Sequence, residues 1–463
     1  MNNTSPTTSP FLPGVRNAIA AIAALLTIPG VMQNAQGITL QARTSQSFVE
    51  SMGVNIHPDY TDSIYYNYSF IRSKLLEVGI LHVRAALINT DPSYWYMPLP
   101  PAGYVNELKT LRQHGITSLL VFDAGGWNQT QPLSSYVGAI QSTIKSYMPA
   151  VDALECTNEC DSSSFRYNGT PFPLGLYWEC AEFFNIVNWD PVTSPIPVLA
   201  PSMADPGHYQ DLANIESPAT YCDIGNGHYY QSGQYADCDG WDFSKNWQTG
   251  YRPYSDLLTA GRPIYISETG YSNATALSGG VSERASGIYV PLVFCEGFRQ
   301  GYARTYLYEF IDGYPDPSGT NWERHFGLLR NNGTPKPAYT ALKNTIYLLN
   351  EWGASFSPQP LSVTIGSAPS TVHYMLLQRS TGVYFLAVWN DVSVYNTSTV
   401  PGTDVYPAKV PVTFTFSKNY QFSVYAPCQA TGATPTSAYT LSTTSKSIRL
   451  NVPAELLIIK IAP

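Results

Sequence analysis

Two glutamates stand where apolar segments of the chain end. Glu159 closes the segment Leu154-Glu-Cys-Thr-Asn-Glu159, and Glu268 closes Ile264-Tyr-Ile-Ser-Glu268. A single glutamate in such a position is most often a solvated loop charge. Two carboxyl groups held about 5 Å apart, by contrast, can carry out double displacement at a sugar carbon, one as nucleophile and the other as proton donor and acceptor. The pair predicts this chemistry, provided that the fold brings the two segment ends together.

The elements that would have to bring Glu159 and Glu268 together follow one repeating pattern: a helix-like run, a glycine and a short apolar strand. The glycines are Gly79, Gly115, Gly261 and Gly301, as expected for the left-handed residue that ends a helix. The first two are 36 residues apart and the last two are 40 apart. The 146 residues from Gly115 to Gly261 equal four such intervals, which leaves space for three further units.

This spacing predicts eight strands alternating with helices, the pattern of a closed parallel (β/α)8 TIM barrel of the α/β class. The expected strands are Gly53–His57, Ile80–Arg84, Ile116–Phe122, Val151–Cys156, Pro197–Ala200, Asp223–His228, Ile264–Glu268 and Thr305–Phe310. An open doubly wound sheet is the alternative, but the sequence contains no glycine-rich nucleotide loop that would favour it. In a barrel, the carboxyl ends of all strands meet at one face, where active sites gather.

The sequence changes character after residue 350. Short alternating strands with polar turns replace the helices, and Ser380-Thr-Gly382 joins two of them as a hairpin. We expect a C-terminal antiparallel β-sandwich over 351–463 beside a barrel over 38–350, with 38–48 available as an additional sandwich strand. Every candidate carboxylate precedes residue 350, so we expect the sandwich to stabilise the barrel without supplying catalytic groups.

Residues 1–37 have the pattern of a secretory signal peptide. The apolar stretch from Ala18 to Met32 is short and contains Pro29 and Gly30, and Ala35-Gln-Gly37 offers small residues to a peptidase. A retained membrane anchor is the alternative. We expect a secreted, extracellular monomer that has no contact with the membrane after cleavage.

The composition agrees with an extracellular protein and argues against two classes of partner. Charged residues make up 13% of the chain, against about a quarter in ordinary soluble proteins, while Tyr (34), Phe (18) and Trp (9) are abundant. The formal net charge is -8 and no run of Lys or Arg occurs. Nucleic acid and anionic membranes are therefore not expected as partners.

Seven cysteines leave at least one thiol outside any set of disulfides within the chain. Cys222 and Cys238 flank the loop after the sixth strand, and in an oxidising compartment we expect them to pair. Cys156 and Cys160 have no second pair at matching spacing, so we expect no metal site. No cofactor is expected either.

The candidate catalytic residues and the predicted strands together resemble a known family. Asn158-Glu159 after the fourth strand and Glu268 after the seventh are similar to the glycoside hydrolase clan of retaining (β/α)8 barrels that includes cellulases, β-mannanases and β-xylosidases. Arg84 after the second strand and His228-Tyr-Tyr230 at the sixth match two further positions. Two segments resemble the approach to the last barrel helix in many members: Phe326-Gly-Leu-Leu and Gly333-Thr-Pro-Lys-Pro-Ala-Tyr339. The resemblance covers roughly residues 50–350.

The resemblance implies hydrolysis of an O-glycosidic bond, with a β-linked polysaccharide or oligosaccharide as the expected substrate. Glu268 would attack the sugar carbon, and Glu159 would donate a proton to the leaving oxygen and then activate water. Arg84 and Tyr230 would hold the Glu268 carboxylate. Asn158 would bind the sugar 2-hydroxyl.

Other candidate positions are less specific. His228 is as readily a hydrogen-bonded structural residue as a substrate ligand. At the eighth strand, Tyr306-Leu-Tyr-Glu-Phe310, this chain lacks the tryptophan that many members place beneath the sugar, and we expect Tyr308 or Glu309 to face the mouth instead. Weaker candidates for substrate contacts are Asp123 and Asp312.

Other functions compete with hydrolysis. A carbohydrate-binding protein on an inactive barrel would lack one of the two carboxylates, and both are present. A surface protein that binds through its sandwich is a second alternative. A serine hydrolase is a third, but no Gly-x-Ser-x-Gly turn occurs.

Overall fold

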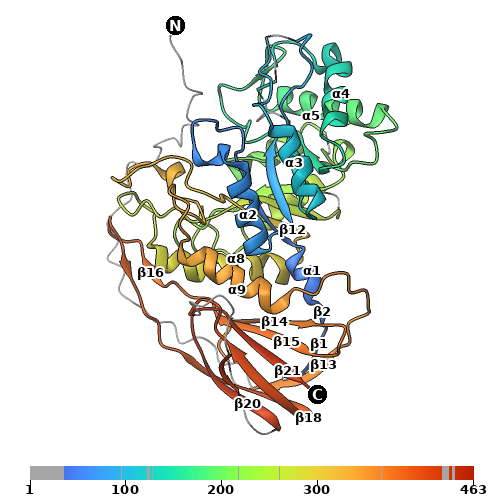
Figure 1. The fold of residues 1–463 in the computed structure, drawn as a ribbon. Coiled ribbons are helices and arrows are strands. Elements are labelled where there is room, and N and C mark those ends of the chain that lie inside the picture. The colour runs from blue at the N-terminus through green and yellow to red at the C-terminus, as the bar shows by residue number, and fades with distance from the viewer. Residues whose placement is uncertain are drawn as a thin grey trace.

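The computed structural model describes residues 36–463 except 95, 123–125, 128, 217, 260, 367, 430–436 and 441–443. Residues 1–35 of the expected signal peptide therefore lie outside the described residues, and so does Asp123. The last two residues of that segment, Gln36 and Gly37, belong to a strand. The described chain forms a barrel stacked on a β-sandwich (Figure 1).

The barrel sheet contains eight parallel strands. They are β3 (Met52–Asn55), β4 (His82–Ala86), β5 (Thr117–Val121), β6 (Val151–Glu155), β9 (Val198–Leu199), β10 (Gly225–His228), β11 (Ile264–Thr269) and β12 (Arg304–Leu307). Hydrogen bonds join β3, β4, β5, β6 and β9 in that order, and they join β10, β11 and β12 in the same way. β12 also pairs with β3. A parallel bridge from Leu199 to Ile224 closes the remaining gap. The predicted closed barrel is confirmed.

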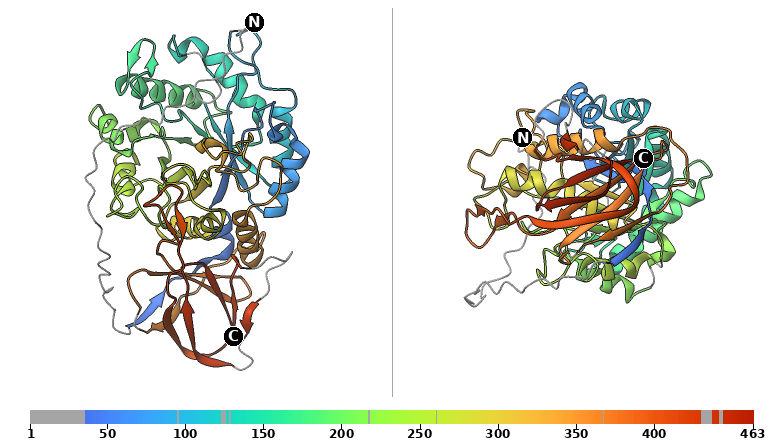
Figure 2. Two further views of the ribbon diagram at one scale, coloured as in Figure 1. Left: turned by 90° about the vertical axis from the view of Figure 1, so that its left-hand side faces the viewer. Right: turned by 90° about the horizontal axis from the view of Figure 1, so that it is seen from below.

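A helix follows each barrel strand, and the helices surround the sheet (Figure 2). They are α2 (Tyr68–Val78), α3 (Tyr104–Gln113), α4 (Val137–Tyr147), α5 (Leu174–Trp189), α6 (Tyr209–Ala213), α7 (Tyr251–Thr259), α8 (Glu283–Arg299) and α9 (Pro337–Leu349). Strands β3, β4, β5 and β10 are buried at every residue, because side chains fill the barrel and helices cover it. Among the described residues, no helix is long and apolar enough to cross a membrane.

The glycines of the sequence pattern end helices as expected. Gly79, Gly115, Gly261 and Gly301 all have φ between 81° and 86°, in the left-handed region. At Gly79 the backbone amide donates to the Leu75 carbonyl and ends α2.

We expect Gly79→Ala to destabilise the protein more than Gly115→Ala. Both substitutions place a Cβ on a left-handed residue, at a cost of about 1 kcal/mol. At Gly79 the new Cβ would also lie 2.8 Å from Ile346 Cγ2 in α9, whereas at Gly115 nothing lies within 4 Å. Overpacking should raise the loss at Gly79 to about 2–3 kcal/mol. Denaturant unfolding of the two variants measures the difference, and equal losses would contradict this account.

Long strand β18 (Val410–Tyr425) joins the two antiparallel sheets of the sandwich. Its first half pairs with β13 (Leu361–Ile365) and β20 (Ser445–Val452), and its second half with β19 (Ser437–Thr440) and β21 (Leu457–Ala462). The second sheet continues through β15 (Tyr384–Asn390) and β14 (Val372–Gln378). Apolar side chains from both sheets, among them Val388, Phe414 and Ile459, pack into one core. The predicted sandwich is confirmed.

The segment before the barrel belongs to the sandwich. β1 (Gln36–Leu40) pairs with β13, and β2 (Arg43–Thr44) pairs with β14. The short helix α1 (Ser45–Val49) then leads into β3. The barrel is therefore an insertion between strands of the sandwich.

Cys222 and Cys238 do not form the predicted disulfide. The Cys222 Sγ lies 3.5 Å from the Leu258 carbonyl oxygen, and the Cys238 Sγ lies 3.4 Å from the carbonyl oxygen of Asp239. The prediction failed because the two residues flank β10 itself: Cys222 precedes the strand and Cys238 follows it.

Candidate active site

Arg84, in β4, organises the carboxyl-end face of the barrel and is 5% exposed. Its Nε and Nη2 donate to the two oxygens of Glu155 at 2.7 and 2.9 Å, and its Nη1 donates to Glu268 Oε1 at 2.6 Å. It also donates to the side-chain oxygens of Asn55, at 2.9 Å, and Asn158, at 2.7 Å. One buried guanidinium thus fixes four side chains, which come from β3, from β6 with the loop directly after it, and from β11.

Glu268, in β11, is held at both oxygens. Arg84 occupies Oε1, and the Tyr230 hydroxyl donates to Oε2 at 2.7 Å. Burial by itself raises the pKa of Glu268, but the charges of His228 and Arg84 and the bond from Tyr230 outweigh it, so the pKa is lowered. Glu268 is consequently an ionised and oriented carboxylate, which suits a nucleophile.

Glu159 lies on the loop after β6, with a φ of 54° that non-glycine residues seldom adopt. Such backbone strain is found most often at functional sites. Its Oε1 lies 2.7 Å from His228 Nδ1, which in turn is 3.7 Å from Glu268 Oε2. Oxygens of the two carboxylates approach within 4.8 Å of each other. The structure therefore brings together the two glutamates that the sequence singled out.

His228 bridges the two glutamates. Its Nε2 lies 3.0 Å from the Ser267 hydroxyl, so both ring nitrogens are engaged by the protein. Burial lowers the pKa of His228, but the Glu268 charge and the contact with Glu159 raise it overall. Of the two readings open from the sequence, this geometry favours a hydrogen-bonded residue over a direct substrate ligand.

By residue type, Glu159, His228 and Glu268 could also ligate a metal ion. The ring nitrogens of His228 and the oxygens of Glu268 already have protein partners in Glu159, Ser267, Arg84 and Tyr230. Among the described residues, no nitrogen or oxygen of these three side chains is buried without a hydrogen-bond partner, so the cluster presents no orphaned ligand atom for a cation.

Tyr308 and Glu309 follow β12 at the edge of the site. Glu309 is 2% exposed, accepts a hydrogen bond from the Tyr65 hydroxyl at 2.9 Å, and has His57 Nε2 at 3.5 Å. Burial raises the pKa of Glu309 well above its ordinary value. Tyr308 is half-buried, and its ring packs edge-on against His57 and Phe326. Of these two neighbours, Tyr308 is the more exposed.

Asp312, the weaker candidate, has a structural role. It accepts hydrogen bonds from Lys336 Nζ at 2.9 Å and from the Gly327 amide at 2.8 Å. These contacts tie the loop after β12 to the start of α9.

Sequence reasoning passed over four polar residues near the site. Asn55 and Glu155 contact Arg84, and His57 contacts Glu309. Glu323 lies in the 3-10 helix η6 (Trp322–Arg324), where burial and then the charges of Glu268 and Glu159 raise its pKa to about 7, against a hydrogen bond with Tyr308 that lowers it. The sequence could have pointed to Glu155, because it is a charged residue inside an apolar strand segment. It could not have pointed to Glu323, which lies in η6, far from any strand end.

No model of a protein family matches the sequence, and no curated protein matches it. Solved structures match in fold. A monomeric β-xylosidase from Caulobacter crescentus CB15 matches with a TM-score of 0.60 at 12% identity, over 91% of this chain and 98% of its own. A family 39 glycoside hydrolase from Bacteroides cellulosilyticus WH2 gives 0.55 at 15% identity, over 90% and 82%. A family 30 subfamily 8 xylanase from Clostridium acetobutylicum gives 0.50 at 13% identity, over 92% and 97%. The shared feature is the fold, barrel and sandwich together.

Proposed function

We propose that the protein is a glycosidase that hydrolyses a β-linked polysaccharide or oligosaccharide with retention of anomeric configuration. The observation that carries the proposal is the carboxylate pair at the barrel mouth, with oxygens at most 4.8 Å apart. Retaining enzymes hold their two carboxyl groups about 5–5.5 Å apart, whereas inverting enzymes leave about 6.5–9.5 Å for a water molecule. The close spacing supports direct attack by one carboxylate.

The environments of the two glutamates support different roles. Glu268 is ionised, and Arg84 and Tyr230 hold both its oxygens, so it attacks the anomeric carbon and forms a glycosyl-enzyme ester. Glu159 is the more exposed of the pair, with 20% of its side chain accessible against 10% for Glu268. It gives its proton to the departing oxygen and later takes one from the water that cleaves the ester.

Asn158 is placed to act on the sugar during both steps. Its side-chain oxygen accepts from Arg84 Nη2 at 2.7 Å, which leaves the amide NH2 group as the donor for a hydroxyl of the substrate. A contact to the sugar 2-hydroxyl strengthens in the transition state. Arg84 therefore orients both Glu268 and Asn158.

The names of the fold neighbours guide the choice of first substrates. One is a β-xylosidase and another a xylanase, so β-xylosides lead the series to be tested. We also propose that the protein acts as a monomer and is exported, the latter on the apolar stretch before Met32 alone.

We expect the protein to hydrolyse at least one 4-nitrophenyl β-glycoside from a panel that begins with the β-xyloside. Proton NMR of the reaction should show the β-anomer as the first sugar released, because double displacement inverts the carbon twice. Glu268→Gln is the matched control, since it keeps the size of the side chain and removes the nucleophile. An α-anomer as first product would refute retention. Failure on the whole aryl glycoside and polysaccharide panel would refute the glycosidase.

A further inference from the structure

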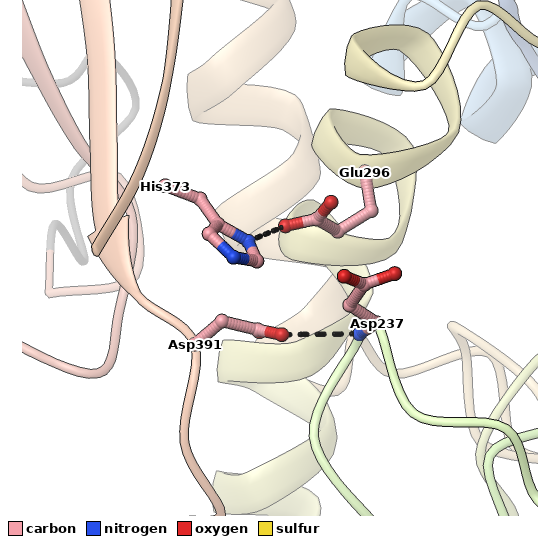
Figure 3. A group of neighbouring side chains, drawn as sticks. All are labelled: Asp237, Glu296, His373 and Asp391. Atoms are coloured by element: carbon pink, nitrogen blue, oxygen red, sulfur yellow. Dashed lines mark hydrogen bonds and ion pairs between the residues drawn. The ribbon is translucent and has the colours of Figure 1, made fainter. Parts of the chain in front are cut away.

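Four side chains of metal-ligand type meet where the barrel rests on the sandwich (Figure 3). Asp237 comes from the loop after β10, Glu296 from α8, His373 from β14, and Asp391 directly follows β15. One ligand atom from each lies within 4.8 Å of the others. This junction cluster shares no residue with the candidate active site.

The junction cluster carries more negative charge than its surroundings neutralise. Asp237, Glu296 and Asp391 are 3%, 0% and 4% exposed. Arg299 is the cation beside them, with Nη2 at 2.6 Å from Glu296 Oε2 and 3.6 Å from Asp237 Oδ2. Three buried carboxyl groups face one guanidinium, and the imidazole of His373 adds at most one further positive charge, so at least one negative charge is left when all three carboxyl groups are ionised. Buried charges are rarely left without compensation, and a bound cation would supply it.

Asp391 provides a second, independent observation. Its Oδ2 accepts from the Asp237 amide at 3.2 Å, but its Oδ1 is buried and has no hydrogen-bond partner among the described residues. In Figure 3 the Asp391 carboxylate points toward the backbone of Asp237, below the ring of His373. A cation bound at the buried Oδ1 atom would give it the partner that the described residues do not supply.

Neutral donors hold the other carboxylates in position. Trp389 Nε1 donates to Glu296 Oε1 at 3.0 Å, and Gln300 Nε2 donates to both Asp237 and Glu296. His373 Nδ1 contacts the same Glu296 Oε1. Such outer partners orient metal ligands and are needed to keep like charges close together.

We propose that the junction cluster binds one divalent transition-metal cation, Mn²⁺ or Zn²⁺, which joins the barrel to the sandwich. The ligands are one oxygen each of Asp237, Glu296 and Asp391 and a ring nitrogen of His373. Carboxylate oxygens suit Mn²⁺ and imidazole suits Zn²⁺, whereas Mg²⁺ and Ca²⁺ prefer oxygen alone. Two ligands belong to the barrel and two to the sandwich, so the bound cation resists their separation.

This site departs from the sequence-based expectation of no metal. That expectation rested on cysteine spacing, whereas the junction cluster contains no cysteine. Its members are spread over the 154 residues from Asp237 to Asp391. No local spacing connects them, and only the packing of the sandwich on α8 brings them together.

The test uses the full chain freed of metal with EDTA and then dialysed. We expect equilibrium dialysis with MnCl2 or ZnCl2 at pH 7.5 to show one cation per chain. At about 100 times the Kd, the melting temperature should rise by roughly 3–6 °C, while MgCl2 at the same concentration should have a smaller effect.

Matched variants locate the cation. Asp391→Asn and His373→Gln should each weaken binding at least about tenfold and abolish the metal-dependent rise in melting temperature. Without metal, Asp391→Asn should melt at or above the metal-free parent, because it removes a buried charge. Asp404→Asn is the control: Asp404, in β17 (Thr403–Asp404), accepts from Ser282 and pairs with Arg284 at another contact of the same junction. It should keep the full response, as should Glu159→Gln.

Three results would overturn the proposal. The first is no cation bound to the metal-free parent at pH 7.5. The second is binding that survives both Asp391→Asn and His373→Gln. The third is binding lost in Glu159→Gln, which would assign the cation to the barrel mouth instead.

Discussion

Replacing Glu268 by alanine should lower the turnover of every glycoside by on the order of 10⁵-fold, whatever the leaving group. The substitution removes the atom that bonds to the sugar, so an activated leaving group cannot compensate. Glu159→Ala removes only the proton donor and the later base, which typically contribute about 10²–10⁴-fold. An activated aryl glycoside should therefore still form the glycosyl-enzyme and show a burst of phenol.

Azide separates the two variants further. Added to Glu159→Ala, it should replace water in the second step and give a glycosyl azide of retained configuration. Both effects are measured by burst kinetics and by NMR of the product. A glycosyl azide of retained configuration from Glu268→Ala, with no effect of azide on Glu159→Ala, would mean that the two roles are exchanged, whereas an azide of inverted configuration from Glu268→Ala agrees with Glu268 as the nucleophile. Unchanged hydrolysis in both variants would remove the catalytic assignment altogether.

Arg84→Met should cost about 3–5 kcal/mol of stability and most of the activity. The guanidinium is the shared cation of the buried Glu155 and Glu268, and its removal leaves two buried carboxylates without their guanidinium partner. Arg84 also lowers the pKa of Glu268, so that pKa should rise in the variant. The acidic limb of kcat/KM should consequently move to higher pH, since a larger fraction of Glu268 is protonated at any given pH.

The pH dependence of unfolding provides the check. In the parent, the lowered pKa of Glu268 contributes stability above the pKa of the unfolded chain, and this stability is lost as pH falls. In Arg84→Met the loss should be largest at neutral and higher pH and should shrink as acid neutralises the unpaired carboxylates. Arg84→Met/Glu155→Gln should be more stable than Arg84→Met alone, because one of those charges is gone. A double variant no more stable than the single would contradict the charge-based explanation.

The barrel could be predicted because its rules are local. Glycines such as Gly79 end helices by their backbone conformation, and strands buried on both faces give short apolar runs at a steady interval. The proximity of Glu159 and Glu268 could be predicted for the same reason, since strand ends in a barrel share one face. The side-chain contacts across the barrel and the cysteine pairing depended on where side chains point and how far apart they lie in the folded protein. The spacing of residues in the sequence does not reveal either.

Glu155 and Cys222 illustrate that limit. Glu155 lies in the very run that identified Glu159, but its importance comes from Arg84, 71 residues away in the chain. Cys222 and Cys238 looked adjacent because one loop was counted between them, whereas a barrel strand separates them. A residue's partners across the barrel are set by tertiary packing, and no short sequence window contains both.

The pairing of β1 with β13 determines how the chain can be assembled. Thr39 faces Ser362 across that pair, 323 residues further along the chain. On the ribosome, β1 is therefore synthesised long before the strand that it needs, and it has to wait until the whole barrel has emerged. Contacts of such long range slow folding, because loop closure precedes the gain from pairing. A chain cut near residue 350 would keep β1 and β2 as unpaired edges, prone to pair with other chains. The sandwich is a discontinuous domain, and a free barrel has to be released by removing residues at both ends.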